Sequence, residues 1–140
     1  MNITHSVINL AGGTLLCAAL VAPAAATRLN CDSAGATDVT MWARYLDTGT
    51  RSTFDVSVLV PETHRGQLNR QWGLFVDGLR VGYLVLTPRG NGRISASLSF
   101  DSYANIGQAD AGVNPFPATW PGAGNGTVVR AGNMTCQLTG

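Results

Sequence analysis

The chain has 140 residues and a net charge of +1, from nine basic residues, all arginine, and eight acids. Its charged fraction of 12% is low against ~25% for average soluble domains. Neither a basic stripe nor an acidic tail is present, which argues against nucleic acid or a strongly basic protein as the partner. The length suits one domain with one hydrophobic core.

The first 26 residues have the features of a secretory signal peptide. Residues 10–22 form an apolar run, and Ala24-Ala25-Ala26 is a small-residue cleavage site, so we expect cleavage before Thr27. The run is shorter than the roughly 20 apolar residues of a membrane span and is interrupted by glycine. We therefore expect a signal peptide over 1–26 and one domain over 27–140, secreted or periplasmic, with no membrane span after signal removal.

Cysteine usage supports export. Cleavage would remove Cys17 and leave Cys31 and Cys136 near the two ends of the mature chain, about 105 residues apart. An even pair in an oxidising compartment predicts a disulfide, which loop entropy makes worth at most about 4–5 kcal/mol. A redox or metal pair is disfavoured, since His64 is the only imidazole that could join the two thiols at zinc. An uncleaved anchor, or a lipoprotein through Cys17, is the alternative to cleavage.

Period-two alternation of apolar and polar residues runs through the mature sequence and predicts β-strands. We expect strands over residues 39–45, 54–60, 72–76, 81–86, 94–100, 127–130 and 134–138, with a polar connection over 61–68 and a turn over 88–92. Asp77-Gly78 is the strongest turn sequence, because it suits the positive φ angles of a two-residue hairpin. Gly82 marks a bulge or a close backbone approach.

These strands predict an all-β chain, and no segment shows a capped helical stripe. The spacing favours a single antiparallel β-sandwich, either immunoglobulin-like or a small Greek-key barrel. A true immunoglobulin domain pairs cysteines from two core strands. Here the bond would instead tie the terminal segments together.

Residues 101–126 are rich in Gly, Pro, Ala and Asn, and a loop of this length is often functional. It carries three aromatic residues, Tyr103, Phe116 and Trp120. We favour a core role in which these rings cover the open end of the sandwich, because aromatic side chains bury large apolar areas. The alternative is a platform for stacking a sugar, together with Trp42 or Trp72, which rests on analogy with other secreted β-sandwiches.

Two other groups of polar residues are candidate sites. Asp101, Asn105 and Asp110 carry oxygens suited to calcium, but their spacing does not match a calcium loop, so solvated or capping roles are favoured. His64 stands near Glu62 without a nucleophile, so a surface role is favoured over acid–base chemistry. We predict no catalytic residue, no metal and no cofactor.

Several short motifs together resemble a pattern in small exported bacterial β-proteins of no assigned function. They are Met41-x-Ala43-Arg44-Tyr45, Phe54, Val76-Asp77-Gly78-x-x-Val81-Gly82, Phe100-Asp101-Ser102 and Pro115-Phe116-Pro117-Ala118-x-Trp120-Pro121. The resemblance implies one exported β-domain. It brings no catalytic or binding residues with it.

The expected function is therefore a binding or structural role at the cell surface or in the periplasm, without catalysis. A glycan or another surface protein would be the partner. One alternative is a carbohydrate-binding module that uses the aromatic residues of the 101–126 loop. Another is a subunit of a filament or surface coat, because exposed strand edges permit edge-to-edge addition.

Overall fold

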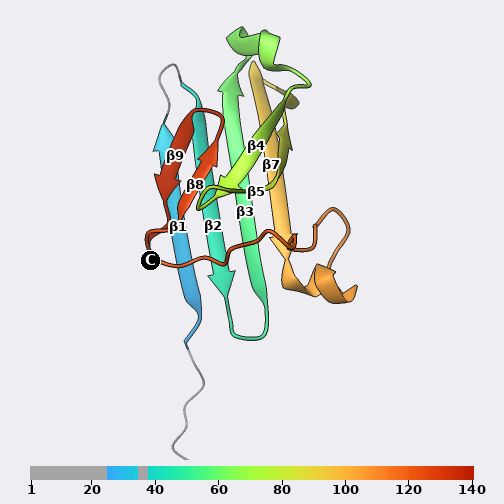
Figure 1. The fold of residues 1–140 in the computed structure, drawn as a ribbon. Helices are drawn as coiled ribbons and strands as arrows, with labels where there is room; N and C mark the ends of the chain where they lie inside the picture. The colour runs from blue at the N-terminus through green and yellow to red at the C-terminus, as the bar shows by residue number, and fades with distance from the viewer. Residues whose placement is uncertain (1–24, 35–37) are drawn as a thin grey trace, which may run out of the picture.

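The computed structural model describes residues 25–34 and 38–140, which form two antiparallel sheets packed face to face (Figure 1). The five-stranded sheet has the order β1 (Thr27–Ala34), β2 (Thr40–Asp47), β3 (Ser52–Pro61), β7 (Arg93–Asp101) and β6 (Thr87–Gly90). The four-stranded sheet has the order β5 (Leu79–Val85), β4 (Gln71–Val76), β8 (Val128–Ala131) and β9 (Met134–Gln137). The predicted signal peptide lies outside the described residues except for Ala25 and Ala26, and so does Cys17.

The predicted β-sandwich is confirmed, and its strand order is that of the immunoglobulin type. If β2 is taken as strand A, then β2-β3-β7-β6 has the order A-B-E-D. The second sheet, β5-β4-β8-β9, has the order C′-C-F-G, in which the extra strand C′ is the one that variable-type domains add. β1 is then an additional edge strand beside strand A.

The sequence pattern does not predict β1 and β6, and both of these strands lie at sheet edges. β1 turns only Leu29 and Cys31 fully into the core, so its apolar signal is weak. All four residues of β6 are exposed and include Pro88, so nothing apolar identifies the strand. The predicted turn over 88–92 is therefore wrong at its start, since only Asn91-Gly92 turns the chain. The polar connection after β3 contains a short 3₁₀ helix, η1 (Glu62–Gln67).

The core lies between the inner faces of the sheets and consists of the alternating apolar residues that predicted the strands. Phe54, Val56, Val58 and Val60 of β3 are at most 1% exposed. Asp77 and Gly78 join β4 to β5 with φ angles of 46° and 80°, as the Asp-Gly turn predicts. Two features account for the glycine within β5: this hairpin has a register shift, and the Leu98 side chain packs against Gly82.

The four-stranded sheet is too short to cover its partner completely. Its strands have four to seven residues, whereas β3 has ten. The segment between η2 (Ser102–Ile106) and β8 crosses β3 and β2 at the uncovered end (Figure 1). This segment therefore completes the hydrophobic core.

Candidate functional site

The rings of Phe116 and Trp120 pack inward from the crossing segment. The Trp120 ring lies 4.9 Å from the Phe54 ring and 4.7 Å from the Phe116 ring, measured between centroids. Phe116 also stacks on Phe100 at 5.8 Å. Both rings are half-buried against the core, as the favoured interpretation expects. Sugar stacking by these two rings stays a prediction.

Asn105 holds the crossing segment in place through its amide group. Its Oδ1 accepts a hydrogen bond from the Phe116 N–H (3.0 Å), and its Nδ2 donates one to the Phe116 carbonyl (3.2 Å). Both polar atoms of this amide therefore bind the backbone, which is a structural role. Asp110 is exposed farther along the loop. Among residues 25–34 and 38–140, no three His, Cys, Asp or Glu side chains gather as metal ligands.

Tyr103 belongs to a separate polar cluster at the same end of the molecule. The Arg51 guanidinium lies 4.7 Å from the centroid of the Tyr103 ring and forms an ion pair with Asp101. The Asp101 carboxylate also accepts the Tyr103 N–H at 2.9 Å, which caps η2. The hydrogen bonds from Arg51 hold the pKa of Asp101 below its ordinary value, although burial opposes them. These contacts connect the β2–β3 turn to the end of β7.

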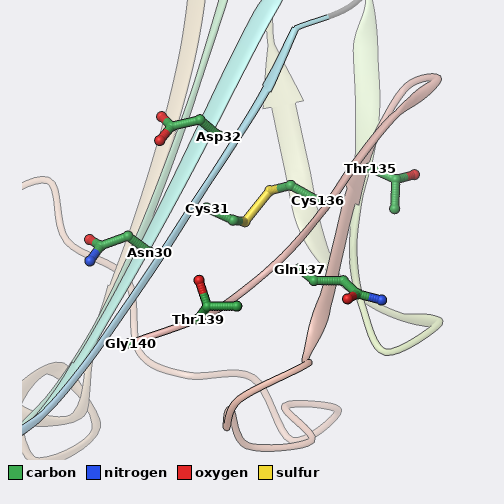
Figure 2. Close-up of a pocket in the computed structure, with 8 residues that line it drawn as sticks. All are labelled: Asn30, Cys31, Asp32, Thr135, Cys136, Gln137, Thr139 and Gly140. Carbon is green, nitrogen blue, oxygen red and sulfur yellow. A yellow bond between two sulfur atoms is a disulfide. The ribbon is translucent and has the colours of Figure 1, made fainter.

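The predicted disulfide is present and joins β1 to β9 across one side of the sandwich (Figure 2). A shallow groove of about 830 Å³ runs along it. The side chains of Asn30, Asp32, Thr135 and Gln137 point away from the sulfur atoms in Figure 2, so strand backbone and the disulfide form the groove. The groove therefore offers few side-chain groups that converge on a ligand.

The groove is also too narrow to receive a strand. The Cα atoms of Cys31 and Cys136 are 5.8 Å apart, whereas a strand inserted between two others would hold them about 9–10 Å apart. Asn30 and Thr139 exchange two backbone hydrogen bonds of 2.9 and 3.0 Å just beyond the disulfide. The edges of β1 and β9 thus protect each other.

The opposite side of the sandwich has two strand edges with different protection. The short β6 contains Pro88 and a register shift, both typical of edges that resist pairing. On β5, the Arg80 carbonyl accepts a hydrogen bond from the Thr119 hydroxyl at 3.0 Å. Each of the four edge strands therefore carries a local protecting contact or irregularity, at Cys31, Cys136, Pro88 and Arg80. The filament or coat subunit stays a prediction.

A more enclosed cavity of about 320 Å³ lies at the end of the sandwich marked by η1 in Figure 1. Its lining comes from the residue before β2, the end of β3, η1, β4 and the β8–β9 turn. These residues are Val39, Val60, His64, Gln67, Trp72, Gly132 and Asn133. In the immunoglobulin assignment, the β3–β4 and β8–β9 connections are the B–C and F–G loops, which variable domains use for recognition. We call this space the end cavity.

Trp72 forms one wall of the end cavity. Its Nε1 donates a hydrogen bond to Gln67 Oε1 at 3.3 Å, which sets the orientation of the indole. Gly132 lies against the six-membered ring, and a Cβ atom there would come within 3.1 Å of it. Gly132 also has a φ of 58°, so both the turn and the close approach favour glycine.

The end cavity combines an apolar surface with polar side chains. Val39, Val60 and the indole supply the apolar part, while Gln67 and Asn133 supply amides and His64 supplies an imidazole. None of its lining residues is Asp, Glu, Arg or Lys. An apolar wall combined with a few polar groups occurs in small-molecule sites, and 320 Å³ falls within their usual range.

The sequence predicts Trp72 only as an additional ring beside the loop aromatics in sugar stacking, and it predicts a surface role for His64. His64 is half-buried beside the cavity, and its Nδ1 lies 3.3 Å from the Thr63 hydroxyl. Glu62 forms an ion pair with Arg65 at 2.6 Å. Gly132-Asn133 is recognisable as a turn sequence, but no residue near it in sequence indicates that the turn contacts Trp72.

Comparison with protein-family models, with curated proteins and with solved structures found no match. The resemblance to small exported bacterial β-proteins therefore stays a prediction. Among the described residues, no helix is long and apolar enough to cross a membrane.

Proposed function

We propose that the chain is an exported, non-catalytic recognition domain that binds a neutral sugar unit in its end cavity. The observation that carries this proposal is the cavity at the B–C and F–G end, which has Trp72 as one wall and no Asp, Glu, Arg or Lys in its lining. This proposal places the sugar against Trp72 rather than against the aromatic residues of the 101–126 loop.

Export is supported by the Cys31–Cys136 disulfide, because such bonds persist mainly outside the cytoplasm. The expected cleavage site also suits the fold, since Thr27 is the first residue of β1. Cleavage there would leave every strand of the sandwich intact.

The chemistry of the cavity favours a sugar over other small ligands. A pyranose ring has an apolar C–H face and a rim of hydroxyl groups, which match an indole wall and amide side chains. A cationic ligand would find no Asp or Glu in the lining, and an unpaired charge is costly to desolvate. Recognition at this end of related sandwich topologies supports the location by analogy of fold.

Titration of the mature protein with a panel of neutral mono- and oligosaccharides tests the proposal, by calorimetry and by tryptophan fluorescence. We expect Asn133→Ala to weaken binding about 3- to 10-fold, which corresponds to a lost hydrogen bond of ~0.5–1.5 kcal/mol. The fluorescence change should disappear in Trp72→Phe. It should persist in Trp42→Phe, because Trp42 lies on the outer face of β2.

Gln108→Ala is the matched control for the amide variant, because Gln108 is exposed at the opposite end of the molecule. Circular dichroism and thermal unfolding verify that each variant is folded. Absence of binding across the panel, or equal binding by wild type, Trp72→Phe and Asn133→Ala, would reject the proposal.

A further inference from the structure

The outer face of the four-stranded sheet carries a row of side chains that neither the core nor the end cavity uses. Strand pairing places Arg80 of β5, Phe75 of β4 and Arg130 of β8 side by side in that order. Thr135 of β9 completes the row. Because neighbouring strands lie about 4.8 Å apart, the two arginine Cα atoms are roughly 10 Å apart.

Both guanidinium groups of this row rest on aromatic rings. Arg130 lies 4.2 Å from the Phe75 ring centroid, and Arg80 lies 4.9 Å from that of Tyr83. The Phe75 ring covers Gly73, where a Cβ atom would come within 2.7 Å of the ring. Stacking uses the flat face of a guanidinium and leaves the N–H groups at its rim able to donate. The two cations are therefore held in place before any ligand arrives.

The row has no opposite charge of its own. The ion pairs among the described residues are Arg51–Asp101 and Arg65–Glu62, and neither involves Arg80 or Arg130. The outward residues of the four strands contain no acid. Asp77, at the β4–β5 turn, accepts the Val128 N–H at 2.9 Å. This face is thus positive on a chain whose net charge is only +1.

We propose that this outer face, the Arg80–Phe75–Arg130 row with Tyr83, binds an acidic polysaccharide through its carboxylate groups. The planar guanidinium fork matches a carboxylate and binds it through two parallel hydrogen bonds. Tyr83 is 46% exposed and offers an apolar edge beside the charges. Gln71, Thr135 and Gln137 on the same face supply partners for sugar hydroxyls.

The face fits a carboxylated glycan better than other polyanions. Affinity for nucleic acid grows with the number of phosphates that are neutralised, and two arginines are few for that purpose. An acidic peptide that added as a strand would need a free backbone edge, and the row lies across the sheet rather than along an edge. The inference does not rest on the end cavity, whose lining contains no Arg or Lys.

Binding of the mature protein to immobilised polygalacturonate, with neutral dextran as the reference surface, tests this inference. We expect retention on polygalacturonate alone, and weakening when NaCl rises from about 0.05 to about 0.5 M. Arg80→Gln and Arg130→Gln should each weaken binding by about tenfold or more, and the double variant should abolish it. Trp72→Phe should bind as wild type does, which separates this inference from the proposed function.

Arg44→Gln is the matched control, because Arg44 also stacks on an aromatic ring, that of Trp42 at 4.8 Å, but on the other sheet. Unchanged binding by the double variant, or equal loss in Arg44→Gln, would overturn the inference. Equal retention on polyglutamate or duplex DNA would overturn the choice of a glycan. A dimer in size-exclusion chromatography that dissociates in the double variant would assign the face to a second copy of the chain instead.

Discussion

Replacement of Asp101 by asparagine should destabilise the fold by an amount that the local structure allows us to estimate. The carboxylate is 2% exposed and accepts hydrogen bonds from Arg51 and from the Tyr103 N–H. Breaking a fully buried ion pair from one side costs about 3–5 kcal/mol. The Arg51 side chain is 43% exposed, however, so water can solvate the cation that remains. We therefore expect the lower cost of a lost charge-assisted hydrogen bond, about 1.5–3 kcal/mol.

The asparagine side chain of the Asp101→Asn variant would still cap η2, because asparagine and aspartate are about equally good caps. Asp101→Ala removes the cap as well and should cost about 1 kcal/mol more. Urea unfolding at pH 7 measures both differences. In a thermal scan, the Asp101→Asn variant should melt roughly 5–15 °C below wild type.

The difference between wild type and Asp101→Asn should also depend on pH. The folded-state pKa of Asp101 is lowered from its ordinary value of 3.8, mainly by the hydrogen bonds from Arg51. The stabilisation is therefore complete above the unfolded-state pKa and is lost as the pH falls through the folded-state pKa. Equal urea midpoints for the two proteins at pH 7, or a difference that stays constant below about pH 4, would refute this account.

Two further perturbations test the packing of the sandwich. Paired replacement of Cys31 and Cys136 by serine should lower the free energy of unfolding by up to about 4–5 kcal/mol, because the bond closes a loop of 105 residues. Intact mass after alkylation without reductant should show no modified thiol in a chain that starts at Thr27, and two modified thiols would contradict the bond. Gly82→Val should lower the free energy of unfolding by about 1–3 kcal/mol through overpacking, because a Cβ atom at residue 82 would lie 2.6 Å from Leu98 Cδ2. Adding Leu98→Ala should recover part of this loss in urea unfolding. Strict additivity of the two free-energy changes would show that the two side chains are not in contact.

Much of the fold could be predicted because its signals are local. The alternation of Phe54, Val56, Val58 and Val60 located β3, and Asp77-Gly78 located a hairpin turn whose φ angles the structure confirms. Each signal depends on neighbours in the chain. β6 has no such signal, because it pairs at an edge without an apolar face, so only its partner β7 identifies it.

The candidate sites required long-range contacts. Trp72 and Gly132 are 60 residues apart in sequence, yet they lie in contact at the end cavity. Arg80 and Arg130 share a row only because β4 lies between β5 and β8. The aromatic residues of the 101–126 loop were conspicuous in sequence, and two of them turn out to complete the core.

By itself the amino-acid sequence determined an all-β sandwich, its main strands and the pairing of Cys31 with Cys136, since periodicity, turn chemistry and cysteine number are properties of the chain. Only the tertiary structure decided which strands share a sheet, which edges are protected and where cavities and charges gather. Those features depend on pairing between residues far apart in sequence, which local patterns do not specify.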